Sequence, residues 1–247
     1  MIIGINGYSG SGKDTVGTII QYLSVNDDNQ PTTSLEDVLE FPITHEWWLE
    51  EQSGWEIKKW AAKLKEIASM LTGIPKHKFE DQEFKKTNLG PEWSFLKMKP
   101  GKRQDGIFPK KVDMDIVLMT VRDFLQKLGT DACRDNLHYN TWVNALMSDY
   151  TPTQVQWADG PLGGYKDGDL PNWIITDTRF PNEADAIRKE NGVLIRIERP
   201  GVKPINDHPS ETGLDHYKFD HVIKNNGSIQ ELADQVKSIL RLHKMLS

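Results

Sequence analysis

The chain has 247 residues, of which 37% are hydrophobic, and it carries 30 Lys and Arg residues against 36 Asp and Glu residues. This composition is typical of an ordered globular protein, and the length predicts one large domain or one domain with a subdomain. The net charge of −6 argues against a protein that mainly coats nucleic acid or an anionic membrane.

Cysteine content and hydropathy indicate the compartment. The single cysteine, Cys133, cannot form an internal disulfide, which fits a reducing cytosol. No run of ~18 apolar residues occurs that could cross a membrane. The N-terminus lacks the basic and then apolar pattern of a signal peptide. We therefore expect a soluble, cytoplasmic protein.

The first predicted elements are a strand, a glycine loop and a helix. Residues 2–6 form a short apolar run, and helical spacing resumes over 16–23. Few periodic positions follow in 24–54, which predicts mostly loop, as a lid or an insertion. A helix closed by Gly73 and Pro75 follows, and residues 55–57 could belong to it or equally form a strand that leads into it. One face of that helix is predicted to carry Trp60, Leu64, Ile67, Ala68 and Leu71.

The middle of the chain is predicted to hold insertions around two helices. Residues 75–118 contain the basic segment 97–113, in which prolines and glycines disfavour a regular helix or strand. Apolar spacing predicts one helix over 121–132 and another over 139–150. With four glycines and three prolines, 151–171 is predicted to be a long surface loop or insertion.

Strands and helices alternate in the last third of the chain. Strands are predicted at 173–176, 193–197 and 219–223, with a helix over 181–190. The capping-box pattern Ser228-Ile-Gln-Glu231 predicts the start of a closing helix. This alternation predicts an α/β fold of three layers, a mainly parallel sheet with helices on both faces.

A phosphate-binding loop lies between the first strand and the first helix. Residues 7–13 fit the first seven positions of G-x-x-x-x-G-K-[ST], and the strand–loop–helix setting disfavours a glycine-rich turn without a ligand. Backbone N–H groups and the helix dipole would face the phosphates, and the lysine would add a mobile charge. The predicted ATP-binding residues here are Gly10, Ser11, Gly12, Lys13, Asp14 and Thr15.

The position after the lysine is unusual for such a loop. It is Asp14 rather than Ser or Thr, and Thr15 follows it. A carboxylate could hold Mg²⁺ through water, or the threonine could take over the usual hydroxyl role. Both residues are therefore candidate metal ligands.

A second group of charged residues follows the strand 173–176. In extended backbone Asp177 and Arg179 point the same way, beyond the carboxyl end of a parallel strand, where functional side chains gather. Asp177 could anchor Mg²⁺ or orient an acceptor, and Arg179 could neutralise phosphate charge in the transition state. The alternative is a surface ion pair. Glu183, in the first turn of the next helix, could also simply complement the helix dipole.

The helix over 121–132 has an uncommon polar face. Arg122, Gln126, Gly129 and Thr130 recur at i, i+4, i+7 and i+8, opposite the apolar residues. Arginine suits a phosphate and glutamine suits the edge of a base, so this face is a candidate pocket wall. Trp142 could stack a base, or it could belong to the core.

With these features the sequence resembles the bacteriophage-type deoxynucleoside monophosphate kinases. The resemblance runs in order over nearly the whole chain, although 24–54, 97–113 and 151–171 match nothing. It rests on Gly7–Thr15, Ala61–Lys65, Arg122 with Gln126–Asp131, Trp142, Asp177–Arg179 with Glu183, Arg199–Gly201, His208–Glu211 and Asn225–Ser228.

The resemblance implies a single P-loop nucleoside monophosphate kinase domain over 1–247, with a helical and loop insertion that binds the acceptor. It implies transfer of the ATP γ-phosphoryl group to a deoxynucleoside 5′-monophosphate with Mg²⁺, in the host cytoplasm if the chain is phage-encoded. Lys13, Arg179 and Asp177 would be catalytic, and Asn225 and Gly227 would flank the adenine. The acceptor site would contain Lys65, Lys86, Arg122, Gly129, Thr130, Trp142, Asp177, Arg179 and Glu183.

Two other functions remain open from the sequence. The closing Asn-Gly-Ser-Ile-x-Glu-Leu pattern is shared with kinases that act on dephospho-coenzyme A, and a nucleotide-binding protein without catalysis would keep the same loop. The expected partners are small nucleotides, with no polymeric nucleic acid and no membrane. The 8 tryptophans are compatible with a homodimer surface as well as with core packing.

Overall fold

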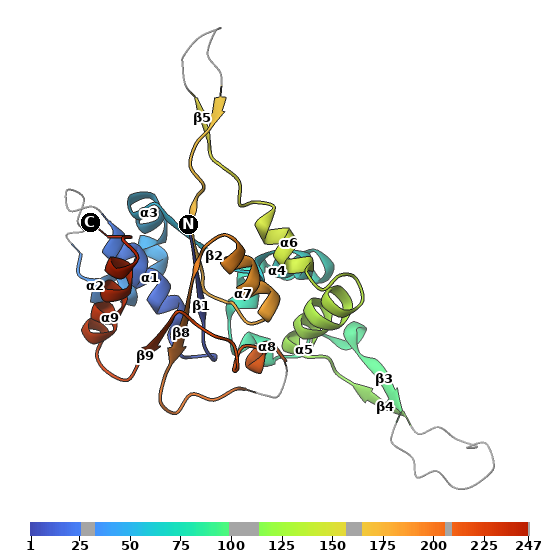
Figure 1. Cartoon of the computed structure of the whole chain (residues 1–247). Coiled ribbons are helices and arrows are strands. Elements are labelled where there is room, and N and C mark those ends of the chain that lie inside the picture. Colours follow the sequence, from blue (N-terminus) through green and yellow to red (C-terminus); the bar gives the residue numbers. More distant parts are fainter. Residues whose placement is uncertain (26–32, 99–113, 157–164, 206–208, 247) are drawn as a thin grey trace. The chain divides into compact units, whose positions relative to one another are not determined.

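The computed structural model describes residues 1–25, 33–98, 114–156, 165–205 and 209–246 (Figure 1). The chain forms two compact units, one made of Met1–Trp60 with Trp142–Ser247 and the other of Ala61–Thr141. Most of the basic segment 97–113 lies outside the described residues. Within the described ranges, no helix is long and apolar enough to cross a membrane.

The first unit is built on a five-stranded sheet in the order β2-β7-β1-β8-β9. Every neighbouring pair of these strands is parallel, which confirms the predicted sheet type. The expected strand at residues 2–6 is confirmed, and the others agree with the prediction within two residues. The strands are β1 (Ile2–Asn6), β2 (Trp55–Lys58), β7 (Asn172–Ile175), β8 (Val193–Glu198) and β9 (His221–Lys224).

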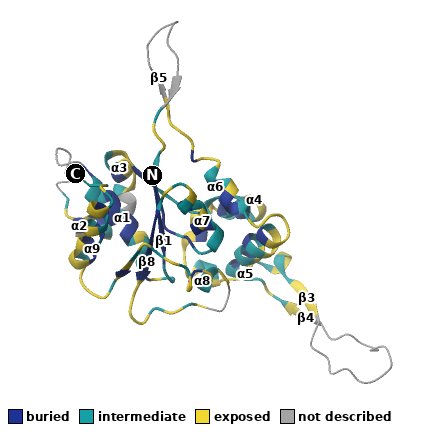
Figure 2. Ribbon diagram, viewed as in Figure 1, coloured by how far each residue is buried: buried dark blue, intermediate teal, exposed yellow. Residues whose placement is uncertain are grey.

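Helices cover both faces of this sheet, because successive side chains of a strand point to opposite sides. Ile3 and Ile5 pack with α1 (Lys13–Ser24) and α9 (Ile229–Leu242). Ile2 packs on the other face with α6 (Thr141–Met147) and α7 (Pro181–Lys189). The buried strands run between the two helical layers in Figure 2. The predicted three-layer α/β fold is confirmed.

The second unit has a small core of its own. Ala68, Phe79, Val121 and Phe124 are buried there. Its short β3–β4 hairpin is antiparallel. Its elements are α4 (Ala62–Thr72), the 3₁₀ turns η2 (Lys76–Glu80), η3 (Phe84–Lys86) and η4 (Pro91–Trp93), β3 (Phe95–Met98), β4 (Met114–Val117), α5 (Val121–Gln126) and the π-helix η5 (Lys127–Asp135).

The prediction of mostly loop over 24–54 is wrong. Its described part forms α2 (Leu35–Glu40) and α3 (Pro42–Ser53). The Ser34 hydroxyl caps α2 by accepting a hydrogen bond from the Asp37 N–H at 3.2 Å. Only a few side chains of these helices reach the core, such as Leu49, so no continuous apolar stripe marks them in the sequence.

Four further expectations need correction. Residues 151–171 contain the antiparallel strands β5 (Gln154–Gln156) and β6 (Tyr165–Asp167), and Lys97 lies in β3 rather than in irregular structure. The helix predicted over 121–132 is α-helical only to Gln126. The face assigned to the helix near 60–71 is also wrong, because Trp60 packs in the first unit and Leu71 is 55% exposed.

The capping box at Ser228 is confirmed. The Ser228 N–H donates to Glu231 Oε2 at 2.7 Å, and the Glu231 N–H donates to Ser228 Oγ at 3.2 Å. A Cβ on Gly227 would collide with the Glu231 carboxylate, so this capping geometry requires glycine there. The box fixes where α9 begins and therefore where the loop after β9 must turn.

Candidate active site

The phosphate loop joins the end of β1 to the start of α1, as predicted. Gly10 and Gly12 have φ angles of 82° and 100°, in the left-handed region that favours glycine. A Cβ on Gly12 would lie 2.6 Å from Nδ2 of Asn225, so a larger residue would also displace the Asn225 side chain. This loop conformation therefore depends on its glycines.

Lys13 lies across the loop that precedes it. Its Nζ donates to the carbonyl oxygens of Gly7 and Tyr8, both at 2.8 Å. Burial and the positive charge of Arg179 lower the pKa of Lys13 to about 8, against the opposing effect of three nearby carboxylates. The ammonium is therefore close to losing its proton, and a phosphate anion would restore its preference for the charged form.

Asp14, the first candidate metal ligand, has two partners from neighbouring strands. Its Oδ1 accepts a hydrogen bond from Thr176 Oγ1 at 2.8 Å and lies 3.3 Å from Lys59 Nζ. Partial loss of hydration raises the pKa of Asp14, but Lys59, the Thr176 hydroxyl and Lys13 outweigh it, so this pKa lies below its ordinary value. The carboxylate is thus ionised and open to solvent, with 72% of the side chain exposed.

Asp177 and Arg179 both act on the charge of Lys13, since the Arg179 guanidinium lowers the pKa of Lys13 and the Asp177 carboxylate raises it. Asp177 Oδ1 accepts a hydrogen bond from the Trp60 backbone N–H at 2.7 Å. Arg179 Nη1 lies 3.0 Å from Oε1 of Glu211 on α8 (Pro209–Thr212). The Glu211 side chain is only 7% exposed and that of Arg179 is 37% exposed, so the guanidinium is anchored on one side and accessible on the other.

Glu183 and Trp142, two candidate acceptor residues, are both buried, at 2% and 4% exposure. Glu183 Oε2 accepts hydrogen bonds from the backbone N–H groups of Arg179 and Phe180, at 2.7 and 3.1 Å. Glu183 therefore caps α7 and fixes the backbone that carries Arg179. Contact of either residue with an acceptor stays a prediction.

The other acceptor candidates lie in the second unit. Buried Lys65 donates to Glu80 Oε1 at 2.5 Å, and Arg122 Nη2 donates to Gln82 Oε1 at 3.1 Å. Lys86 is exposed and pairs with Glu83 at 2.7 Å.

The regular helical face assumed for Arg122, Gln126, Gly129 and Thr130 is wrong. Gly129 and Thr130 belong to the π-helix, whose wider turn breaks the spacing of an α-helix. Gly129 is buried, and a Cβ there would lie 2.9 Å from Cδ2 of Leu64. Direct contact of these residues with an acceptor stays a prediction.

Sequence reasoning gave no role to Lys59 or Arg199, and it expected Asn225 at the adenine rather than on the loop. Arg199 Nη1 donates to the Gly10 carbonyl oxygen at 3.2 Å, and Asn225 Nδ2 donates to the carbonyl oxygen of buried Ser11 at 2.8 Å. Lys59 and Arg199 both directly follow strands, so the rule that functional groups gather at carboxyl ends of strands could have found them. A cavity of about 270 Å³ at the ends of β8 and β9 is lined by Glu198, Arg199, Pro200, Lys224 and Asn226.

The family model for deoxynucleotide monophosphate kinases matches residues 102–236. The chain belongs to this family. It is 34% identical over 123 residues to the deoxynucleotide monophosphate kinase of Enterobacteria phage T4, which covers 50% of this chain and 46% of that protein. The corresponding protein of Escherichia phage RB69 is 29% identical over 122 residues, covering 49% and 45%.

A longer match is the deoxynucleoside-5′-monophosphate kinase of Escherichia phage T5, 25% identical over 252 residues, or 91% of this chain and 89% of that protein. The chain thus spans about half the length of the T4 and RB69 proteins and most of the T5 protein. The predicted family is confirmed.

Proposed function

We propose that this protein transfers the γ-phosphoryl group of ATP to the phosphate of a deoxynucleoside 5′-monophosphate. The observation that carries the proposal is the phosphate loop, with Lys13 across it and Arg179 and Asp177 beside it, in a member of this kinase family. The proposed setting is the cytoplasm, of the host if the chain is phage-encoded, with small nucleotides as partners and neither polymeric nucleic acid nor a membrane. A homodimer stays a prediction.

ATP would bind with its phosphates in the loop and its base at the nearby cavity. The loop N–H groups and the start of α1 favour an anion, and Lys13 would exchange its two carbonyl partners for phosphate oxygens. Asn226, which lies between Asn225 and Gly227 in the chain, lines this cavity with Arg199 and Lys224, and we assign the cavity to the adenine end of the nucleotide. This arrangement supports the predicted ATP contacts.

The transfer itself needs little covalent chemistry from the protein. An acceptor phosphate oxygen attacks the γ-phosphorus, the bond from that phosphorus to the β–γ bridging oxygen breaks, and ADP leaves. Lys13 and Arg179 would supply positive charge around the transferred group, and Asp177 would orient the acceptor. The Glu211 carboxylate binds the Arg179 guanidinium and so orients its positive charge.

Asp14 and Thr15 are the proposed holders of Mg²⁺. Ionised, exposed Asp14 fits a hard cation that also binds ATP phosphates, since Mg²⁺ in kinases commonly takes one or two carboxylates and completes its shell with phosphate and water. Bound there, the ion would shield phosphate charge. Lys59, 3.3 Å from Asp14, would have to share this carboxylate or move from it.

The acceptor would also use the second unit. Lys65 and Arg122 offer positive charge for its phosphate, and Gln126 can donate to and accept from a base edge. Lys86, Gly129 and Thr130 are proposed as further acceptor contacts on the resemblance alone. The rivals are a kinase for dephospho-coenzyme A and a nucleotide-binding protein without catalysis.

An assay of ADP release over deoxynucleoside monophosphates, ribonucleoside monophosphates and dephospho-coenzyme A tests the proposal. We expect release with a deoxynucleoside monophosphate and a loss of about 10²–10³-fold in Lys13→Ala, by analogy with other deleted transition-state contacts. Lys189→Ala, on the exposed end of α7, is the control and should keep full activity.

The other outcomes separate the rivals. Activity with dephospho-coenzyme A alone would favour the first rival. ATP binding without ADP release for any acceptor would favour the second. Full activity in a folded Lys13→Ala protein would contradict the kinase assignment of this loop.

A further inference from the structure

Tyr8, the second residue of the phosphate loop, is held at both ends. Its carbonyl oxygen accepts hydrogen bonds from Lys13 Nζ at 2.8 Å and from the Ser11 N–H at 3.1 Å. Its hydroxyl donates to Oδ1 of Asp215 at 2.9 Å, more than 200 positions further along the chain. The loop is therefore tied, through one side chain, to the segment that follows α8.

Arg196 of β8 binds the same carboxylate, that of Asp215. Its Nη2 donates to Asp215 Oδ1 at 2.9 Å, and its guanidinium carbon lies 5.2 Å from the centroid of the Tyr8 ring. Its Nη1 donates to Oδ1 of Asn6, the last residue of β1, at 3.0 Å. With 14% of its side chain exposed, Arg196 is a partly desolvated cation. Its further partners are the Leu214 carbonyl oxygen at 3.4 Å, Glu198 Oε1 at 4.0 Å and the Phe219 ring, whose centroid lies 5.7 Å away.

The network continues to the second group of charged residues. Asn6 Nδ2 donates to the carbonyl oxygen of Thr178 at 2.8 Å. Thr178 lies between Asp177 and Arg179 in the chain. The segment 209–215 also carries Glu211, which holds the Arg179 guanidinium. One short segment after β8 thus supports both the phosphate loop and the arginine proposed to act on the transferred group.

A glycine-rich loop loses much conformational freedom when it closes around phosphates, and that loss weakens binding. A loop fixed beforehand avoids part of this cost. The two hydrogen bonds to the Tyr8 carbonyl oxygen set the shape of the loop. The Tyr8 side chain connects this residue to the rest of the unit, through Asp215.

We propose that Asp215 and Arg196 are positioning residues that hold Tyr8, and with it the phosphate loop, in the conformation that receives the phosphates of ATP. The inference rests on the proposed function only in taking ATP as the ligand of the loop. It predicts an effect on ATP binding and none on recognition of the acceptor.

The test measures the dissociation constant of ATP by calorimetry on the full chain, for Tyr8→Phe, Asp215→Ala and the double variant. Each single change should raise this constant about five- to tenfold, as expected for the loss of a hydrogen bond to a charged group. The double variant should bind ATP no worse than the single variant with the lower affinity. Both changes remove the same hydrogen bond, from the Tyr8 hydroxyl to Asp215. The acceptor KM should stay at its wild-type value.

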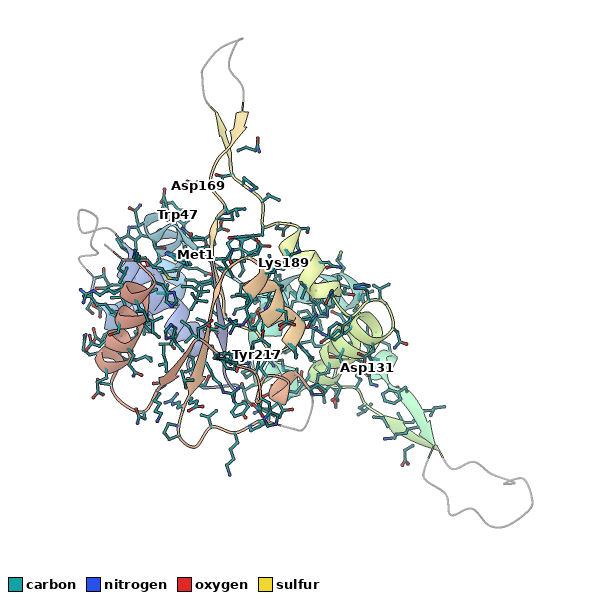
Figure 3. All side chains as sticks on the ribbon, viewed as in Figure 1. Met1, Trp47, Asp131, Asp169, Lys189 and Tyr217 are labelled. Atoms are coloured by element: carbon teal, nitrogen blue, oxygen red, sulfur yellow. The ribbon has the colours of Figure 1, made fainter. Side chains whose placement is uncertain are left out.

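Tyr217 offers a matched control in the same unit, labelled in Figure 3. Its hydroxyl donates to Oδ1 of Asp185 at 2.7 Å, and the guanidinium carbon of Arg188 lies 5.8 Å from its ring centroid. Tyr217→Phe therefore removes the same kind of tyrosine–aspartate bond beside an arginine, and it leaves the Tyr8 hydroxyl and Asp215 unchanged. It should leave the dissociation constant of ATP unchanged.

Equal losses of thermal stability in Tyr8→Phe and Tyr217→Phe, with ATP affinity unchanged in both, would overturn the inference in favour of a purely structural network. A rise in the acceptor KM alone would also overturn it. A wild-type chain that binds ATP without phosphorylating any acceptor would refute the proposed function, while the affinities of the variants would still decide this inference.

Discussion

Lys13 combines two properties that a phosphate-binding lysine needs. Its Nζ bonds two loop carbonyls, which keep the amine in place before a nucleotide arrives. Burial and the positive charge of Arg179 lower the pKa of Lys13 to about 8, so in the free protein this amine loses its proton more readily than an ordinary lysine. A polyphosphate supplies the missing negative charge, and ATP binding and protonation of Lys13 should therefore favour each other.

This linkage predicts how kcat/KM for ATP depends on pH. The value of kcat/KM reports ionisations of the free enzyme, and the Lys13 amine is mostly neutral above its pKa of about 8. We expect kcat/KM for ATP to fall as the pH rises from 7.5 to 9.5. In Lys13→Arg the guanidinium stays charged, so that variant should have a lower but flatter profile. Parallel declines in both proteins would assign the titration to another group.

At the scale of single residues, the sequence predicts residue types at the site better than their partners. Lys13 and its loop follow from a local pattern of glycines before a helix. The bonds from Thr176 to Asp14 and from Asn225 to Ser11 depend on which strand ends become neighbours in the sheet. Spacing along the chain does not contain that information, so these partners required the structure.

At the scale of elements, the closing helix α9 is held at both ends. The capping box fixes its start, and Leu232, Val236 and Leu240 bury its apolar face against the sheet. At its C-terminal end, His243 Nε2 lies 2.8 Å from Nε2 of His221 on the edge strand β9, with the rings nearly perpendicular. This bond requires that at least one of the two rings is neutral.

The histidine pair predicts a loss of stability in acid. Burial, and then the nearby His243, lower the pKa of His221 below its ordinary value, against the opposing effect of Asp220. The unfolded chain therefore binds more protons just below pH 6.5, and the free energy of unfolding should fall as the pH decreases through that region. Urea unfolding at pH 7.5 and 5.5 should show a smaller loss in His221→Gln than in the wild type.

His216→Gln, which changes an exposed histidine of the same unit, is the control for this measurement. It should keep the wild-type loss of stability between the two pH values. An identical loss in His221→Gln would mean that other groups cause the acid sensitivity.

Elements were predictable where one local signal determines them. The inner strands β1, β7 and β8 are mostly apolar because both of their faces are covered, Gly73 marks the C-terminal end of α4, and the capping box marks the start of α9. The helix α3 carries no such signal, since exposed Trp47 alternates with buried Leu49 along it. The π-helix after α5 breaks the 3.6-residue spacing on which any prediction of its face depends.

At the scale of the whole molecule, the proposed functions divide between the two units. The phosphate loop, Asp177 and Arg179 belong to the first unit, whereas Lys65 and Arg122 belong to the second. Each unit has its own buried core in the described residues. ATP binding would then depend on the first core alone, and phosphoryl transfer on both. That residues 1–247 act as a single kinase domain stays a prediction.

Phe79→Ala tests this division. Phe79 is fully buried in the small core of the second unit, and its truncation should cost about 3–5 kcal/mol there. We expect turnover of the acceptor to fall sharply. The dissociation constant of ATP, measured by calorimetry, should stay within about twofold of the wild-type value, because the lost packing energy belongs to the core of the second unit.

Leu240→Ala, which removes a fully buried side chain from the core beneath α9, is the control and should weaken ATP binding. If both variants weaken ATP binding equally, the two units unfold together and the chain behaves as one cooperative domain.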